Sequence, residues 1–260
     1  MKVVIIGTGN VATVLGRIFK SAGFEIVQVF GRNSQHAATL AEEINSVPCN
    51  EWIDINKEAD IYLVALADTA LYELDQHLLL SKQLVLHTAG SVSKDVLKNI
   101  SANYGVLYPM QSLRKEMDVL TEIPLLVEGN NEHTIQAIWD IASRISKNVS
   151  FVNEEARLKL HVAAIFINNF TNHLYAVTAD FCKKEALNFN LLLPLAAETA
   201  KRIKWISPEK VITGPAIRKD EVTINKHLDL LKDHPFIQKI YRQMTESISE
   251  FYSSVKLTLK

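Results

Sequence analysis

The stretch Lys2-Val-Val-Ile-Ile-Gly7-Thr8-Gly9-Asn10-Val11-Ala12 decides the fold of the first half of the chain. Its apolar run predicts a buried parallel strand, and the apolar residues that follow at helical spacing predict a helix after the glycines. A Gly-x-Gly-x-x-Ala spacing between strand and helix is typical of a dinucleotide-binding turn, where Gly7 allows a sharp turn and Gly9 leaves room for a phosphate. The alternative is a strand-turn-helix unit that binds nothing. We expect a cofactor pyrophosphate to contact Gly7, Thr8, Gly9, Asn10 and Val11.

The second predicted strand, residues 25–30, ends in a segment that bears on which dinucleotide could bind. An NAD site places Asp or Glu here, because a carboxylate accepts from the ribose 2′-hydroxyl and repels a 2′-phosphate. This chain has Gly-Arg32-Asn33-Ser34 instead, and a guanidinium offers paired donors to a phosphate. We therefore predict NADP(H) in preference to NAD(H), held by Arg32, Asn33 and Ser34. The alternative is an exposed arginine beside a helix N-cap at Ser34.

The bulk composition is that of a globular protein without nucleic-acid or membrane signals. The 260 residues include 48% hydrophobic and 22% charged side chains with a net charge of −1, and Lys and Arg are scattered. Cys49 and Cys182 are too few for a disulfide framework or metal cluster and fit a reducing cytosol. A cleaved signal peptide would remove the first strand, and polar residues interrupt the most apolar stretch, 162–179. We expect a cytoplasmic protein that binds no metal, nucleic acid or membrane.

Strand-like and helix-like segments alternate through the first half of the chain. Strands are predicted at 2–6, 25–30, 61–66, 83–87, 106–108, 124–128 and 149–152, and helices after the glycine turn and at 34–44, 68–80 and 132–145. The run at 61–66 is apolar throughout, as expected of a central strand covered on both faces. This alternation predicts an α/β Rossmann domain with a mostly parallel, doubly wound sheet, which we place at residues 1–152.

The pattern changes at Asn153, beyond which no strand is predicted. One very long helix is predicted from Glu154 to about Ala186, followed by helices at 191–206, 220–231 and 236–255. We therefore predict an all-α C-terminal domain at residues 153–260 that contributes to substrate binding. Its long helix is apolar on nearly every face, so we also expect this domain to form a homodimer interface.

Three segments of the chain resemble a known family. They are residues 108–112 (YPMQS), residues 161–170 (HVAAIFINNF), and residues 213–220 (TGPAIRKD) with His227. The chain resembles a bacterial family of Rossmann-like proteins with an uncharacterised C-terminal helical domain, described as NADP oxidoreductases. Its domain order is similar to that of the superfamily of 6-phosphogluconate dehydrogenase, 3-hydroxyisobutyrate dehydrogenase and pyrroline-5-carboxylate reductase. The resemblance spans essentially the whole chain and implies the fold and the cofactor class, but that family supplies no substrate.

Ligands of an open α/β sheet bind beyond the carboxyl ends of its strands. Segments 66–68, 87–90 and 108–112 follow three predicted strands, and the first two are expected to flank the nicotinamide half of the cofactor. Asp68 and His87 also have structural interpretations, as a helix N-cap and a locally bonded histidine. The predicted cofactor contacts here are Leu66, Ala67, Asp68 and Ala89, and the predicted substrate contacts are Gln111 and Ser112.

The long predicted helix carries a polar stripe. At about 100° per residue, His161, Asn168 and Asn172 share one face of an otherwise apolar helix. These groups need partners, because an unpaired buried amide costs about 1–3 kcal/mol. One interpretation is that they bond neighbouring helices or a dimer partner. The other is a catalytic strip in which His161 donates a proton, Asn168 orients the substrate and Asn172 binds it.

Two further positions bear on the chemistry. The superfamily resemblance implies a lysine acid on this helix, but Lys159 lies about 200° round the helix from His161 and so off the stripe. A histidine titrating near neutral pH can take that role. Arg218 follows a Gly-Pro turn and is a candidate clamp for a substrate carboxylate, or else a surface partner of Asp220.

These features together predict an NADP(H)-dependent oxidoreductase that acts on a small carbonyl or imine metabolite, and so on CH-OH or CH-NH donors. The cofactor supplies the hydride, while the protein supplies geometry, a dry cleft and a proton donor. A non-catalytic dinucleotide-binding sensor or scaffold is the alternative, because fold alone does not establish chemistry. Consumption of NADPH with small oxo acids or cyclic imines distinguishes the two.

Overall fold

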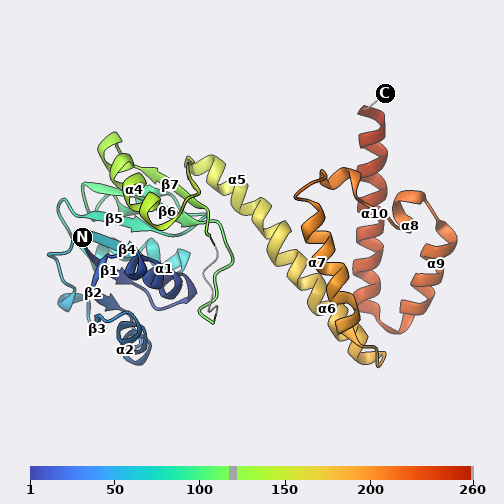
Figure 1. Cartoon of the computed structure of the whole chain (residues 1–260), viewed down its shortest axis with the longest axis horizontal. Helices are drawn as coiled ribbons and strands as arrows, with labels where there is room; N and C mark the ends of the chain where they lie inside the picture. Colours follow the sequence, from blue (N-terminus) through green and yellow to red (C-terminus); the bar gives the residue numbers. More distant parts are fainter. Residues whose placement is uncertain (117–121, 259–260) are drawn as a thin grey trace. The chain divides into compact units, whose positions relative to one another are not determined.

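The computed structural model describes residues 1–116 and 122–258 and divides into two compact units, Met1–Asn168 and Asn169–Lys260 (Figure 1). The first unit contains an eight-stranded sheet, and every regular element that the structure describes in the second is a helix or a 3-10 turn. The predicted fold class is therefore confirmed. The division between the units falls inside the long helical run, and the functional boundary placed at residue 153 stays a prediction.

The sheet of the first unit is mostly parallel. Its strands lie in the order β3-β2-β1-β4-β5-β6-β7-β8, with β6 and β7 antiparallel and every other neighbouring pair parallel. Because β1 pairs with β2 on one side and β4 on the other, the carboxyl end of β1 is the switch point where ligands bind in such sheets. The strands are β1 (Lys2–Ile6), β2 (Glu25–Phe30), β3 (Val47–Cys49), β4 (Ile61–Val64), β5 (Leu84–His87), β6 (Asn103–Pro109), β7 (Leu125–Gly129) and β8 (Val149–Phe151).

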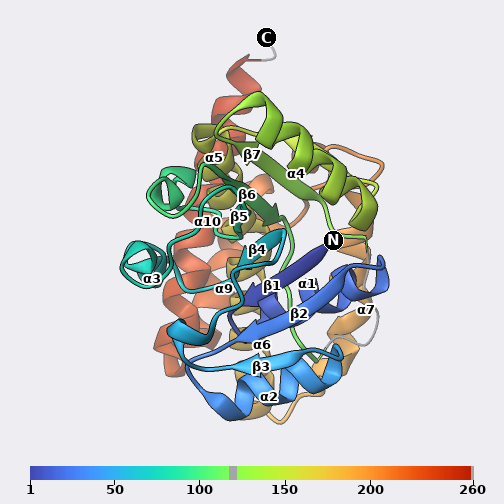
Figure 2. The same cartoon turned by 90° about the vertical axis from the view of Figure 1, so that its left-hand side faces the viewer.

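Helices cover both faces of the sheet (Figure 2). On one face lie α1 (Asn10–Ser21), α2 (Ser34–Glu43) and α4 (Glu132–Ile145), and on the other lie α3 (Asp68–Leu71) and the 3-10 turns Leu74–Gln76 and Lys94–Leu97. Each face of the sheet has its own hydrophobic core, and alternate residues of β1 point into one core or the other. Val3 and Ile5 pack with α1, whereas Val4 and Ile6 pack with Leu71 and Leu74. A strand covered on both faces explains the continuous apolar run in the sequence.

Three local predictions are corrected by the structure. The helix predicted at 68–80 is only α3, followed by a separate 3-10 turn, although Leu71, Leu74 and Leu78 are all buried at helical spacing. The apolar pattern therefore did not reveal the break. The N-cap of α2 is Asn33, whose side chain accepts from the His36 amide at 2.9 Å, and not Ser34. Short β3 was not predicted.

The long helical run starts as predicted but is not a uniform α-helix. It consists of α5 (Glu154–Ala164), a π-helical segment (Ile165–Phe170) and α6 (Thr171–Lys184). A π-helical turn holds more residues than an α-helical one. The assumption of about 100° per residue therefore fails over this segment, and Asn168 and Asn172 cannot be placed on the face of His161 by counting residues.

The second unit has a small buried core. Its buried hydrophobic residues, among those described, are Cys182, Ala216, Ile224 and Leu231, while Leu191, Trp205 and Val222 are each at least 76% exposed. None of the helices that the structure describes is long and apolar enough to cross a membrane. Beyond α6, its elements are α7 (Leu193–Arg202), α8 (Pro215–Arg218), α9 (Glu221–Leu230), α10 (Pro235–Thr258) and the 3-10 turns Phe189–Leu192, Pro208–Lys210 and Leu231–Asp233.

Candidate cofactor cradle and active site

The glycine turn between β1 and α1 uses its two glycines for different reasons. Gly7 has φ +126°, and an added Cβ would lie 2.2 Å from the carbonyl oxygen of Ala65. Gly9 is the N-cap of α1 with φ −81° and ψ −174°, a backbone that any residue adopts, and an added Cβ would meet no atom within 4 Å. Gly7 is therefore required by the fold, whereas Gly9 leaves empty space in front of the amides of α1. This space fits a pyrophosphate at a helix N-terminus.

A cavity of about 420 Å³ opens in front of this turn. It brings together three groups of sequence-predicted cofactor residues: the turn itself, the end of β2 and the end of β4. The predicted residues that line it are Gly7, Thr8, Gly9, Arg32, Asn33, Leu66 and Ala67. Arg32 and Asn33 are both exposed at the cavity. The Arg32 guanidinium and Nδ2 of Asn33 can face a ligand there, whereas Oδ1 of Asn33 already accepts from the His36 amide.

Five predicted cofactor residues do not line this cavity. Ser34 is exposed at the first position of α2, and Val11 is half-buried behind the turn. Asn10 begins α1, and its side-chain oxygen accepts from the Lys115 amide at 3.2 Å. Asp68 and Ala89 belong to the neighbouring polar cluster described below.

Aromatic residues that the sequence analysis missed form one wall of the same cavity. The ring of Trp52 packs against Phe30 with centroids 4.0 Å apart, and it stacks on the His77 ring at 5.1 Å and 7°. Trp52 follows the unpredicted strand β3, and His77 falls in the segment wrongly predicted as continuous helix. No local pattern indicated that these two side chains meet.

A second polar cluster lies around Gly90, immediately after β5. The hydroxyl of Tyr108, at the end of β6, is 3.0 Å from Nδ1 of His161 on α5. An added Cβ on Gly90 would lie 2.7 Å from Nδ1 of His161 and 2.9 Å from Cζ of Tyr108, so glycine is needed for this close approach. Burial is the main cause that raises the pKa of Tyr108 above its usual value. Its phenol is therefore protonated at neutral pH.

The same cluster includes a hydrogen-bonded pair from two strand ends. Ser91 donates its hydroxyl proton to the carboxylate of Asp68, which is the first residue of α3. The N-cap of α3 is Ala67, so the predicted structural role of Asp68 as the N-cap is wrong. Sequence analysis placed Asp68 in the site but gave no sign of its partner.

His87 takes the structural role that the sequence analysis left open. It is fully buried, its Nδ1 accepts from the Ala89 amide at 3.2 Å, and its Nε2 donates to the Ser93 carbonyl at 3.3 Å. Burial lowers its pKa to about 4, and the charge of Arg157 acts in the same direction. His87 is therefore neutral near pH 7 and shapes the loop that carries Gly90.

The remaining predicted residues are dispersed. Gln111 and Ser112 are exposed and bonded to each other, through the Ser112 amide and Gln111 Oε1 at 3.0 Å. Asn168 lies in the π-helical segment. Asn172 and Arg218 belong to the second unit, where Arg218 Nη2 is 4.0 Å from Asp220 Oδ2. The predicted roles of these residues in substrate binding stay predictions.

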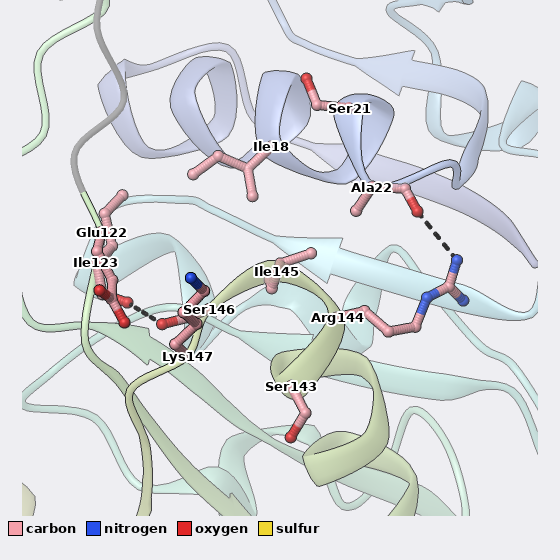
Figure 3. A pocket seen from close by; sticks show the side chains of 10 residues that line it. All are labelled: Ile18, Ser21, Ala22, Glu122, Ile123, Ser143, Arg144, Ile145, Ser146 and Lys147. Carbon is pink, nitrogen blue, oxygen red and sulfur yellow. Dashed lines mark hydrogen bonds between the residues drawn. The ribbon is translucent and has the colours of Figure 1, made fainter.

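Another cavity, of about 540 Å³, lies where the C-terminal ends of α1 and α4 meet (Figure 3). Arg144 donates to the Ala22 carbonyl at 3.1 Å and so joins the ends of α4 and α1, while Ser146, the C-cap of α4, donates to the Ile123 carbonyl at 2.7 Å in the segment before β7. This cavity is one length of α1, roughly 18 Å, from the glycine turn. It contains none of the predicted site residues. Within the described residues, no group of three or more His, Cys, Asp or Glu could hold a metal ion.

Both parts of the chain match known family models. Residues 2–90 match the family "NADP oxidoreductase coenzyme F420-dependent", and residues 123–248 match a domain of unknown function, DUF2520. A Bacteroides fragilis protein, described as a "putative NADP oxidoreductase", is 37% identical over 96% of this chain and 98% of its own, with a TM-score of 0.87. A search of curated proteins found no significant match.

More distant solved structures share the fold. An imine reductase from Myxococcus stipitatus in complex with NADP+ is 16% identical, over 98% of this chain and 95% of its own, with a TM-score of 0.66. A 1-pyrroline-5-carboxylate reductase from Streptococcus pyogenes is 13% identical, over 96% of this chain and 98% of its own, with a TM-score of 0.65. At these identities the likeness extends to the fold alone.

Proposed function

Because the chain belongs to the oxidoreductase family that joins an NADP oxidoreductase domain to DUF2520, we propose that it is an NADPH-dependent reductase of a small carbonyl or imine compound. The observation that carries this proposal is the pairing of Tyr108 with His161 at 3.0 Å, at the carboxyl edge of a sheet that also carries the open glycine turn. A binding cradle and a proton donor at the same edge are what reduction requires of the protein.

The residues of the cradle fit NADPH. The amides at the start of α1, in front of Gly9, would bind the pyrophosphate. The exposed guanidinium of Arg32 and the side chain of Asn33 would bind the ribose 2′-phosphate, a contact that NAD(H) cannot make. Half-buried Trp52 and exposed His77 line this cavity and offer a surface for the adenine ring. The bound cofactor would supply the hydride, and the chain's own groups would supply the binding geometry and the proton donor.

The Tyr108–His161 pair supports a specific route for the proton. Because the Tyr108 phenol is protonated, its hydroxyl can donate to Nδ1 of His161, which selects the Nε2–H tautomer of the ring. Nε2 would then give its proton to the oxygen or nitrogen of the reduced group while the Tyr108 hydroxyl proton passes to Nδ1, and solvent would reprotonate the phenolate that is left. His161 is half-buried, which limits competing proton exchange with water while leaving the ring reachable.

Substitution of the pair tests this function. We expect His161→Ala to lower turnover by roughly 10²–10⁴-fold, the usual contribution of a positioned acid, with unchanged NADPH affinity. Tyr108→Phe removes the group that sets the tautomer and should lower turnover less. His133→Ala, an exposed histidine on α4, is the matched control.

The assay follows loss of NADPH absorbance with a panel of small oxo acids and cyclic imines. Wild-type turnover in His161→Ala would overturn the proton-donor role. NADPH binding without turnover of any panel member would instead favour a dinucleotide-binding sensor or scaffold. Preference for one panel class would decide between a carbonyl and an imine substrate.

We infer that the helical residues 153–260 provide the substrate and dimerisation domain. The support for dimerisation is the small core of the second unit together with its exposed apolar side chains, Leu191, Trp205 and Val222. The candidate substrate contacts are Gln111, Ser112 and Asn168 in the first unit, and Asn172 and Arg218 in the second. Light scattering of the purified chain tests the dimer, and a monomer at micromolar concentration would contradict it.

A further inference from the structure

Arg157 is a buried arginine that the proposed function does not use. It lies on α5, one turn before His161, and is only 1% exposed. Its Nη1 pairs with the carboxylate of Glu128 on β7, and its Nη2 donates to the Val92 carbonyl at 2.7 Å. Its Nε has no hydrogen-bond partner among the described residues. A buried guanidinium with an unsatisfied donor is costly, so its position needs a physical reason.

The contacts of Arg157 converge on the Tyr108–His161 pair. Residues at i and i+4 share a helix face, so Arg157 and His161 project from the same side of α5. Val92, which accepts from Arg157, lies in the loop of residues 88–93 that also contains Gly90. Gly90 in turn is the residue against which Tyr108 and His161 both pack. The guanidinium therefore joins α5, β7 and this loop directly beside the pair.

We propose that Arg157 is the positioning residue of this site: it ties α5 to β7 and to the loop of residues 88–93, and so keeps His161 within hydrogen-bond reach of Tyr108. The catalytic part of this proposal rests on the proposed function, whereas the geometric part does not. Lys94 supports the arrangement, because its ammonium lies 3.2 Å from the second oxygen of Glu128 and compensates that carboxylate.

The charges around the pair shift the pKa of Tyr108 in opposite directions. The positive charge of Arg157 lowers the pKa of Tyr108 and opposes the larger effect of burial, while the carboxylate of Asp68 raises it. Arg157 also disfavours protonation of the neighbouring His87. Loss of the guanidinium should therefore raise the pH at which Tyr108 ionises.

Three variants separate positioning from simple stability. Arg157→Lys keeps the charge but cannot reach both Glu128 and Val92 with one planar group. Removing Arg157 alone would leave a buried carboxylate, so the double variant Arg157→Met/Glu128→Gln removes both charges and preserves folding. Lys159→Met is the matched control on the same helix, because Lys159 is exposed and its ion pair is with Glu155, which is exposed too.

The first readout is ¹⁵N NMR of the His161 ring, assigned with His161→Ala. In the wild type we expect the shifts of a single Nε2–H tautomer. Both Arg157 variants should shift toward averaged tautomers, and Lys159→Met should not. Retention of the wild-type ring shifts in folded Arg157→Lys and in the double variant would overturn the proposal.

The second readout is steady-state kinetics with NADPH and the best panel substrate. Both Arg157 variants should lose roughly 10–100-fold in kcat, the cost of slight misplacement of a reacting group, with NADPH affinity within about twofold of wild type. In the double variant, the alkaline limb of the kcat profile should also move to higher pH. Wild-type kcat in both variants would refute the positioning role. If the wild type were inactive, the proposed function would be refuted, but the positioning of His161 by Arg157 would still be tested by the NMR measurement.

Discussion

Gly9→Val should abolish cofactor binding while the protein stays folded. The backbone at Gly9 has φ −81°, and a Cβ added there meets no atom within 4 Å, so valine enters without steric strain. A β-branched residue is a poorer N-cap than glycine by about 1 kcal/mol, and the loss of glycine flexibility in the unfolded chain offsets part of that cost. We expect a change of about 1 kcal/mol or less in the free energy of unfolding.

The effect on binding should be much larger. The valine side chain would fill the space in front of the α1 amides, and a pyrophosphate would lose at least two charge-assisted hydrogen bonds. At about 1.5–3 kcal/mol each, their loss corresponds to roughly 10²–10⁴-fold in the dissociation constant.

Gly7→Ala is the comparison variant, because it should lower stability where Gly9→Val should lower cofactor affinity. Its φ of +126° and the 2.2 Å approach to the Ala65 oxygen require the backbone to move. It should lower the free energy of unfolding by at least about 2 kcal/mol. Calorimetric titration with NADPH and urea denaturation of both variants measure the two effects. A folded Gly9→Val protein with wild-type NADPH affinity would refute the assignment of this turn to the cofactor.

Three further changes test other parts of the site. Arg32→Ala should weaken NADPH binding by about 10–100-fold and leave NADH binding unchanged in calorimetry, and equal wild-type affinities would contradict the NADP preference. His87 has a folded pKa of about 4 against 6.5 in the unfolded chain, so its contribution of roughly 3 kcal/mol should be complete above pH 6.5 and lost as pH falls toward 4, as urea denaturation would show. His87→Asn should flatten that pH dependence, and an unchanged curve would argue against a neutral buried ring. Trp52 should change its fluorescence when NADPH binds, and a signal that persists in Trp52→Phe would place the adenine elsewhere.

Much of the first unit could be predicted from the sequence because its signals are local. Residues 2–12 contain the strand, the turn and the helix start in one continuous segment, and the structure forms all three. The predicted NADP preference rests on Arg32 at the end of the next strand, and the structure brings that residue to the same cavity as Gly7 and Gly9. Strand ends meet at one edge of a parallel sheet, so this proximity follows from topology alone.

Side-chain pairs between distant elements could not be predicted in this way. Tyr108 and His161 are 53 residues apart, and their meeting depends on the register of β6 and the placement of α5. Trp52 and His77 meet because β3 and a break in the predicted helix bring their loops together. Periodicity describes which face of an element is apolar, but it does not specify the partner of a polar side chain.

The sequence by itself therefore determined the glycine turn between β1 and α1, the mostly parallel sheet and the helical second half. Tertiary structure alone decided the polar site: a buried ion pair between Arg157 and Glu128, a glycine at position 90 and the hydrogen bond between Tyr108 and His161. The physical reason is that backbone turns and apolar periodicity act over neighbouring residues. Hydrogen bonds and ion pairs between side chains depend instead on distances of a few ångströms between elements far apart in the chain.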